Sequence, residues 1–360
     1  MLRHRLLTAA LALTALFVIA ACGSSEDEQP EPELHFLNWE DYVDPAILEG
    51  FEAEYGVKVI IHTFEDEPEL VSRLTSPDAG QFDLFVSSGT VIGELSESRL
   101  VAEFDRERVN NLANINPAYL GKVWDPENRY SAPYDWGTTG VLYNTQYITP
   151  DELSWSLLSD PEIAPHAALD SDFSVVIGLA LIAAGHPMAS TDPDHLDDAV
   201  ALLQNQVRNG IRFDDAYTLR VMMQEGELWA SQAFDGDAAT AIAQNPDLAF
   251  FVPTEGSDIY FDMFGIPRDA SNKIGAELFI NYVLRAEIHA LATEYTGYQN
   301  PNEEAARLGL LEEQTGELQL HVAESGDRLQ AWQVFDDDEY SAWNRAWTEV
   351  QSAQSSSATR

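Results

Sequence analysis

The fold is decided by residues 34–64, which read LHFLNWEDYVDPAILEGFEAEYGVKVIIHTF. Leu34–Leu37 is a short apolar run typical of a buried strand, and Val57–Phe64 is a second run rich in β-branched residues. Between them, Pro45 marks a helix start and Gly56 marks its end. The helix carries a single apolar stripe, formed by Ile47, Leu48, Phe51 and Tyr55. A strand, a helix and a second strand in this order are typical of a parallel α/β unit.

The same alternation continues along the chain and predicts an α/β protein with mostly parallel sheets. We expect further strands at Phe82–Val86, Gly140–Tyr143, Ala230–Phe234, Leu248–Val252 and Ile259–Ile266. We expect further helices at Pro68–Thr75, Asp194–Arg208, Ile274–Leu284, Glu287–Tyr295, Glu303–Leu308 and Glu339–Val350. The segment Gln314–Gly326 shows no clear pattern and receives no assignment.

The N-terminus carries an export pattern. Arg3 and Arg5 precede the uncharged run Leu6–Ala21, which ends at Cys22, the only cysteine of the sequence. The junction resembles a bacterial lipobox, in which the cysteine is acylated, so we expect a signal peptide over residues 1–21 and a lipid anchor at Cys22. The alternative is a buried core helix with an incidental cysteine. With Cys22 used by the anchor, we expect no disulfide and no thiolate metal site.

The composition is strongly acidic. The formal net charge is −42, from 61 acidic and 19 basic residues. This charge excludes nucleic acid as a partner and indicates adaptation to high salt, where the Debye length falls to ~3 Å at 1 M and self-repulsion is screened. Because the same salt screens exposed attraction, any site for a cation has to be enclosed.

No catalytic or metal-binding motif is evident. The eight histidines do not have the spacing of a metal-protease pair, and the sequence has no nucleophile elbow. The acidic run Asp336–Glu339 lacks the glycine and the ligand spacing of a calcium loop and is interpreted as a helix start. We therefore expect no metal, no cofactor and no enzyme.

Candidate ligand residues follow the expected strands, because open parallel sheets bind ligands beyond the carboxyl ends of their strands. Trp39, Glu40 and Tyr42 follow the first strand, Ser88 follows the third, and Asp235–Asp237 follows Ala230–Phe234. Aromatic rings and carboxylates are the groups that bind organic cations. The sequence thus indicates a site for an organic ammonium compound.

Four motifs carry a family resemblance over nearly the whole chain, from Leu34 to Val350. They are Asn38-Trp39-Glu40-Asp41-Tyr42-Val43, Pro133-Tyr134-Asp135-Trp136-Gly137-Thr138, Gly265-Ile266-Pro267 and Thr296-Gly297-Tyr298-Gln299-Asn300-Pro301-Asn302. The chain resembles the periplasmic spermidine/putrescine-binding proteins of ABC transporters. The resemblance implies a type II solute-binding fold, in which two lobes, each a mostly parallel sheet flanked by helices, hold the ligand in the cleft between them.

We place the expected boundaries from that resemblance. Residues 34–138 plus 261–305 form the first lobe, and residues 139–260 plus 306–352 form the second. An acidic tether over residues 22–33 precedes the lobes, and a disordered tail over residues 353–360 follows them.

The resemblance also implies individual ligand contacts. They are Trp39, Tyr42, Ser88, Asp172, Phe234, Tyr260, Asp262, Tyr298 and Gln330, to which we add Glu40. Asp172 is expected to hold a terminal amine, and Asp262 an amine deep in the cleft. Val175 and Thr90 depart from the family pattern, where a second carboxylate and an aromatic residue can stand. These departures favour a shorter ligand such as putrescine, unless Glu40, Asp135 or Asp237 compensates.

Several of these residues have a structural alternative. Trp39 and Tyr42 could instead be core aromatics, but their flanking acids and strand-end position favour the site. Asp172 could instead be a helix cap, in which case neighbouring Asp170 would take its place. Asp262 as a turn residue is the weaker alternative, because burying a carboxylate in an apolar strand without a cationic partner is costly.

The predicted function is capture of a polyamine outside the cytoplasmic membrane by a monomeric lipoprotein, which delivers the ligand to an ABC permease. Three alternatives remain at this point. In the first, the cleft binds a quaternary ammonium osmolyte. In the second, the protein reports polyamine to a membrane sensor. In the third, the protein is a secreted hydrolase that uses Asp172 and Asp262 as an acid/base pair.

Overall fold

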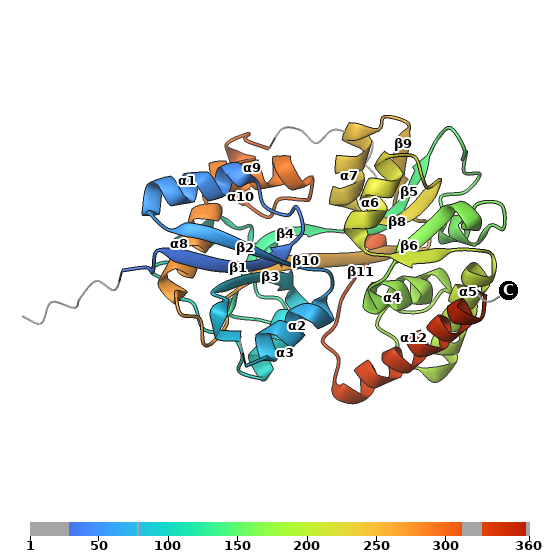
Figure 1. Cartoon of the computed structure of the whole chain (residues 1–360), viewed down its shortest axis with the longest axis horizontal. Helices are drawn as coiled ribbons and strands as arrows, with labels where there is room; N and C mark the ends of the chain where they lie inside the picture. The colour runs from blue at the N-terminus through green and yellow to red at the C-terminus, as the bar shows by residue number, and fades with distance from the viewer. Residues whose placement is uncertain (1–28, 78, 312–325, 358–360) are drawn as a thin grey trace, which may run out of the picture.

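The computed structural model describes residues 29–77, 79–311 and 326–357. It has two lobes, each built on one β-sheet with helices on both faces (Figure 1). The expected signal peptide and Cys22 lie outside the described residues. In the described part of the chain, no helix has both the length and the apolar character that a membrane crossing requires.

The first lobe contains a six-stranded sheet in the order β11-β10-β3-β1-β2, with β4 also paired to β10. Its strands are β1 (Glu33–Trp39), β2 (Lys58–Phe64), β3 (Leu84–Ser88), β4 (Ser131–Gly137), β10 (Ser257–Gly265) and β11 (Leu329–Ala331). β1 runs parallel to β2 and β3, as the opening pattern predicts. β10 is antiparallel to β3 and β4, because the chain re-enters this sheet from the second lobe.

The second lobe contains a five-stranded sheet in the order β7-β6-β8-β5-β9. Its strands are β5 (Thr139–Asn144), β6 (Ala167–Asp170), β7 (Arg212–Asp214), β8 (Ala230–Phe234) and β9 (Leu248–Phe251). β6 runs parallel to β7 and β8, whereas β5 is antiparallel to β8 and β9. Both sheets therefore combine parallel and antiparallel pairs within an α/β architecture.

Helices cover both faces of each sheet (Figure 1). Those of the first lobe are α1 (Pro45–Tyr55), α2 (Glu67–Thr75), α3 (Gly89–Glu97), α8 (Lys273–Val283), α9 (Ala286–Thr296) and α10 (Glu303–Arg307). Those of the second lobe are α4 (Phe173–Ala183), α5 (Pro193–Arg208), α6 (Ala216–Gln224), α7 (Asp235–Gln244) and α12 (Asp337–Ser357). Each face has its own buried apolar cluster, so each lobe has the core it needs to hold its shape.

The first helix shows why the local sequence folds as predicted. Asp44 precedes α1 and its carboxylate accepts a hydrogen bond from the Ala46 amide, while Pro45 occupies the first helical position. Gly56 ends the helix in the left-handed conformation, with φ of 69°, which glycine adopts at little cost. Ile47 and Phe51 are the buried residues of the predicted stripe.

In the described part of the chain, the lobes are joined where β4 continues into β5, where β9 leads into β10, and where β11 leads to α12. Thr138 lies at the first crossing, and its hydroxyl donates to the Asp258 carbonyl at 2.7 Å. The Asp258 carboxylate in turn accepts from the Thr139 amide at 2.8 Å. Asp258 is 1% exposed, so these bonds fasten the first two of these crossings to each other in the interior.

The last helix extends further than the boundaries expected from the sequence. α12 continues to Ser357, past residue 353, where we placed the start of a disordered tail. Ala353 packs against the core of the second lobe beyond buried Trp343, Trp347 and Val350. Once these residues hold the helix, each added residue costs little because the nucleus already exists.

Candidate functional site

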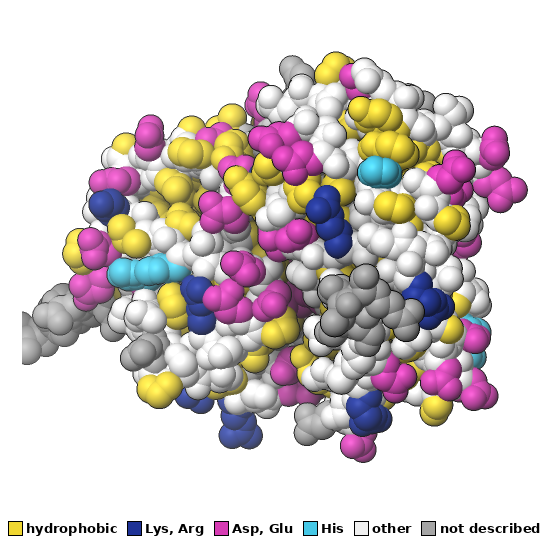
Figure 2. Space-filling model, turned by 45° about the vertical axis from the view of Figure 1, so that its right-hand side comes forward, with side chains coloured by type: hydrophobic (Ala, Val, Ile, Leu, Met, Phe, Trp, Pro, Cys, Tyr) yellow, Lys and Arg dark blue, Asp and Glu magenta, His cyan; other side chains and the backbone are white. Residues whose placement is uncertain are grey.

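A cleft of about 1350 Å³ lies between the lobes and is lined by residues of both. Figure 2 shows acidic side chains gathered around the middle of the molecule, where the lobes meet. Among the described residues that line the cleft, fourteen are acidic and two, Arg73 and Arg220, are basic. The cleft is therefore electrostatically suited to a cation.

The structure brings together nearly all of the predicted ligand residues. The cleft is lined by Trp39, Glu40, Tyr42, Ser88, Asp172, Phe234, Tyr260, Asp262 and Tyr298. Gln330 is not among the lining residues, because its side-chain oxygen accepts from the Met188 amide at 2.9 Å and is held within the second lobe.

Aromatic rings form much of the wall. Trp39, at the end of β1, packs on Phe64 at the end of β2, with 4.2 Å between ring centroids. Tyr298 packs edge-on against Tyr42 at 5.4 Å, and Phe234 against Tyr260 at 5.3 Å. Rings supported in this way cannot collapse into the cleft, and their faces are available to an ammonium group at ~0.5–2 kcal/mol per contact.

Asp262 is the carboxylate of the central strand β10, and it belongs to a buried pair. The Tyr42 hydroxyl lies 2.7 Å from Asp262 and 3.0 Å from Asp135, its register partner on β4. Burial and the charge of Asp262 raise the pKa of Asp135 well above its usual range, whereas burial raises the pKa of Asp262 to about 6. Asp135 is 4% exposed and does not line the cleft. Asp262 is thus the member of the pair that faces a ligand in the cleft, and Asp135 lies behind it.

The second lobe contributes a pair of carboxylates at the end of β6. Asp172 caps α4, accepting from the Ser174 amide at 2.9 Å, and its own amide donates to Asp170 at 2.8 Å. Burial and the charge of Asp172 raise the pKa of Asp170 to about 8. The capping role of Asp172 and its place in the cleft occur together, because the start of α4 faces the cleft.

Glu67 is a third carboxyl group of the cleft that the sequence analysis missed. It lies at the start of α2 and accepts from the Ser88 amide and the Ser87 hydroxyl, both at 2.9 Å. Burial and the charge of Asp172 raise the pKa of Glu67 to about 7. Its position three residues after β2 is a strand-end signal of the kind that identified Trp39.

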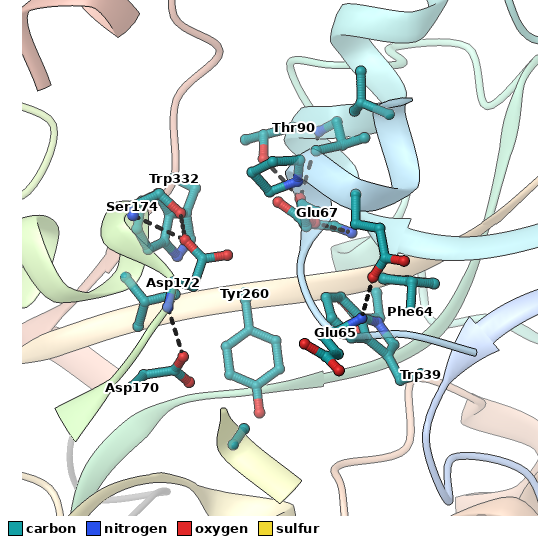
Figure 3. A pocket seen from close by; sticks show the side chains of 18 of the residues that line it. Trp39, Phe64, Glu65, Glu67, Thr90, Asp170, Asp172, Ser174, Tyr260 and Trp332 are labelled. Carbon is teal, nitrogen blue, oxygen red and sulfur yellow. Dashed lines mark hydrogen bonds between the residues drawn. The ribbon is translucent and has the colours of Figure 1, made fainter. Parts of the chain in front are cut away.

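Figure 3 shows how these groups face one another. Asp170 and Asp172 lie on one side of Tyr260, and Glu65 and Glu67 lie on the other side. The carboxyl groups of the two lobes thus face each other across an aromatic ring. A charged compound with an apolar stem fits such an arrangement, because each end meets a carboxylate and the stem meets rings.

The two departures from the family pattern also lie at the cleft. Val175 follows Asp172 in the first turn of α4 and is 9% exposed. Thr90 lies in the first turn of α3, and its hydroxyl is 2.9 Å from the Ser88 hydroxyl. Neither side chain supplies a charge or a ring. Compared with the family pattern, the cleft wall is therefore more apolar at Val175 and has a smaller side chain at Thr90.

One cation of the wall is already paired within the protein. Arg220, on α6, donates to Asp41 of the first lobe at 2.7 Å and to Asp237 of the second lobe at 3.2 Å. The Asp237 carboxylate also accepts from the Tyr298 hydroxyl at 3.2 Å. Sequence reasoning did not identify this pairing, because Asp41 and Arg220 are far apart in the chain.

Comparison with known proteins agrees with this geometry. The family model described as bacterial extracellular solute-binding protein matches residues 46–316. The spermidine/putrescine-binding periplasmic protein of Salmonella typhimurium is 32% identical over 307 residues, which cover 85% of this chain and 86% of that protein. The putrescine/agmatine-binding protein of Pseudomonas aeruginosa is 30% identical over 319 residues, covering 83% and 86%.

A solved structure shares the fold. The spermidine/putrescine ABC transporter substrate-binding protein of Streptococcus pneumoniae matches with a TM-score of 0.75 at 27% identity, covering 90% of this chain and all of that one. The similarity extends over both lobes, as the resemblance found in the sequence predicts.

Proposed function

This chain belongs to the bacterial extracellular solute-binding protein family, and from that premise we propose that it captures a polyamine in its cleft and delivers it to an ABC permease. The observation that supports this most directly is the set of carboxyl groups that face each other across the cleft. Asp262 lies on the central strand, Asp170 and Asp172 lie in the second lobe, and Glu67 lies in the first.

The chemistry of this set suits ammonium groups on a short carbon chain. Attraction between opposite charges rises steeply when water is excluded, so a closed cleft binds a cation even where salt screens the outer surface. The rings of Trp39, Tyr260 and Tyr298 supply apolar contact and cation–π attraction to the stem. Hinged closure of the lobes around the ligand then produces the form that a permease recognises.

The remaining parts of the proposal concern location and assembly. The protein works as a monomer outside the cytoplasmic membrane, anchored through a lipid on Cys22. It binds and releases its ligand without chemical change, so no acid/base role is assigned to Asp172 or Asp262.

Isothermal titration tests the ligand class. The full-length protein in mild detergent and about 1 M salt, which reduces the Debye length to ~3 Å, is titrated with putrescine, spermidine, spermine and glycine betaine. We expect 1:1 binding of at least one polyamine and no heat with betaine. Binding of betaine alone would replace the polyamine proposal with the quaternary ammonium alternative.

A substitution localises the binding. Asp262→Asn is expected to weaken polyamine binding by at least about thirtyfold, because removing one partner of a buried charge pair costs about 2–5 kcal/mol. Asp192→Asn is the control, since Asp192 caps α5 and does not line the cleft. Near-native affinity of the Asp262→Asn protein would contradict the assignment of the site.

A further inference from the structure

Arg220 is a cation built into the wall of a cleft that otherwise attracts cations. It lies on α6 with 9% of its side chain exposed. Its Cζ lies 5.0 Å from the centroid of the Tyr217 ring, and its guanidinium binds acids of both lobes. Asp41 is 41% exposed, so this pairing lies where the cleft meets solvent.

The two acids that bind Arg220 are themselves held in place. The Tyr295 hydroxyl donates to Asp41, and the Tyr298 hydroxyl donates to Asp237. The guanidinium is thereby fixed between two anchored carboxylates and one ring. Moving the guanidinium away from Asp237 would break a charge-assisted hydrogen bond. The Asp237 side chain is only 14% exposed, so little water could replace that bond.

This arrangement changes which carboxylates are available to a ligand. Asp237 lines the cleft near Asp170, but its carboxylate is already bound by Arg220. An ammonium group brought to Asp237 would meet the guanidinium, a like charge, at close range. Among the less exposed lining carboxyl groups, Asp262, Asp170, Asp172 and Glu67 have no cationic partner in the described part of the chain.

We propose that Arg220 determines ligand specificity by withholding Asp237, so that the cleft selects an organic cation with two ammonium groups over one with three. This inference rests on the proposed polyamine function and specifies its substrate class. A diamine places one ammonium group at Asp262 and the other among the remaining carboxyl groups. A third ammonium group that approached Asp237 would meet the guanidinium of Arg220, a like charge.

The test compares putrescine with spermidine by titration of the full-length protein in about 1 M salt. The wild-type protein is expected to bind putrescine more tightly. In Arg220→Gln, the affinity for spermidine relative to putrescine should rise about tenfold, the usual gain from one new hydrogen bond to a charged group. Arg73→Gln is the matched control. It removes the same charge from another residue that lines the cleft, but Arg73 is paired with Glu69 on its own helix.

A second substitution separates specificity from a structural bridge. Asp237→Asn in the wild-type background should leave the affinity for putrescine within about threefold, whereas in the Arg220→Gln background it should abolish the gain for spermidine. Tenfold weaker binding of putrescine by Asp237→Asn alone would overturn the inference. The single substitution Asp237→Asn therefore tests the inference even if the Arg220→Gln protein does not fold.

The remaining outcomes are distinguishable. If both ligands lose affinity in parallel in Arg220→Gln, or if the ratio does not change, Arg220 is only a bridge between lobes and the inference is wrong while the polyamine function stands. If the wild-type protein binds neither ligand, the proposed function fails, and the inference fails with it.

Discussion

Asp172 has a structural role and a proposed binding role that one substitution separates. Asn caps helices about as well as Asp, so Asp172→Asn keeps the cap of α4 but removes a charge from the cleft. We expect polyamine affinity to fall at least about tenfold. We expect the free energy of unfolding to change by less than about 0.5 kcal/mol. Titration and urea unfolding measure the two quantities.

The control for this prediction is Asp192→Asn at the start of α5. Asp192 accepts from the amide two residues ahead, as Asp172 does, but lies outside the cleft. Asp192→Asn should change neither the polyamine affinity nor the free energy of unfolding. If Asp172→Asn lost stability but kept its affinity, Asp172 would be a cap and nothing more.

Ligand binding should depend on pH through the buried carboxyl groups. Burial raises the pKa of Asp262 to about 6, that of Glu67 to about 7 and that of Asp170 to about 8. A bound ammonium group stabilises the ionised form, so binding lowers these pKa values and releases protons. Affinity is therefore highest above the raised values and is lost as the pH falls through them, from about 8 to about 6.

Titration calorimetry in buffers of different ionisation enthalpy measures the released protons directly. We expect net release at neutral pH and weaker binding at about pH 5.5 than at about pH 8. Affinity that stays constant over this range would show that the carboxyl groups are ionised before the ligand arrives.

At the residue level, the sequence predicted the groups that follow strand ends or match family motifs. Trp39, Tyr42 and Asp262 all lie at the cleft. Gln330 does not, because a backbone amide of the second lobe takes up its side-chain oxygen. The pairing of Arg220 with Asp41 could not be predicted, because it depends on how the two lobes meet, which no local pattern encodes.

At the level of elements, the crossing strand β4 requires a glycine where it reaches the second lobe. A Cβ built on Gly137 would overlap with the Asp235 carboxylate and the Tyr260 hydroxyl, which are hydrogen-bonded to each other at 3.0 Å. Gly137→Ala should therefore lower the free energy of unfolding by about 1–3 kcal/mol, the usual cost of overpacking. Urea unfolding measures this change.

Gly80→Ala is the matched control for that substitution. A Cβ on Gly80 would have its nearest contact at 3.6 Å, which is ordinary van der Waals distance. Its effect should be within about 0.5 kcal/mol. Equal stability of the two variants would show that the crossing adjusts without cost.

Elements with a clear periodic pattern were predicted well, and those without one were missed. β8 has the predicted bounds, and α1 begins and ends at the predicted residues. The sequence FSVVIGLALIA of α4 is apolar on all sides because the helix is almost completely buried, so it shows no stripe. α7 begins directly after β8, with no polar loop to mark its start.

At the level of the whole molecule, the net charge of −42 makes stability depend on salt. Repulsion between surface carboxylates weakens as the Debye length falls from ~10 Å at 0.1 M to ~3 Å at 1 M. The midpoint of urea unfolding should therefore rise with sodium chloride over this range. Urea is the suitable denaturant because guanidinium would itself screen the charge. A midpoint that does not change would contradict adaptation of the surface to salt.

The position of β10 has a consequence for the order in which the protein can be assembled after synthesis. This strand pairs with β3, β4 and β11, yet it is made after every strand of the second sheet. A nascent chain that ends before Ser257 holds β1, β2 and β3 without the strand that connects them to β4. The first lobe therefore completes its sheet only after every strand of the second sheet has been synthesised, and neither lobe corresponds to a continuous fragment that could be expressed by itself.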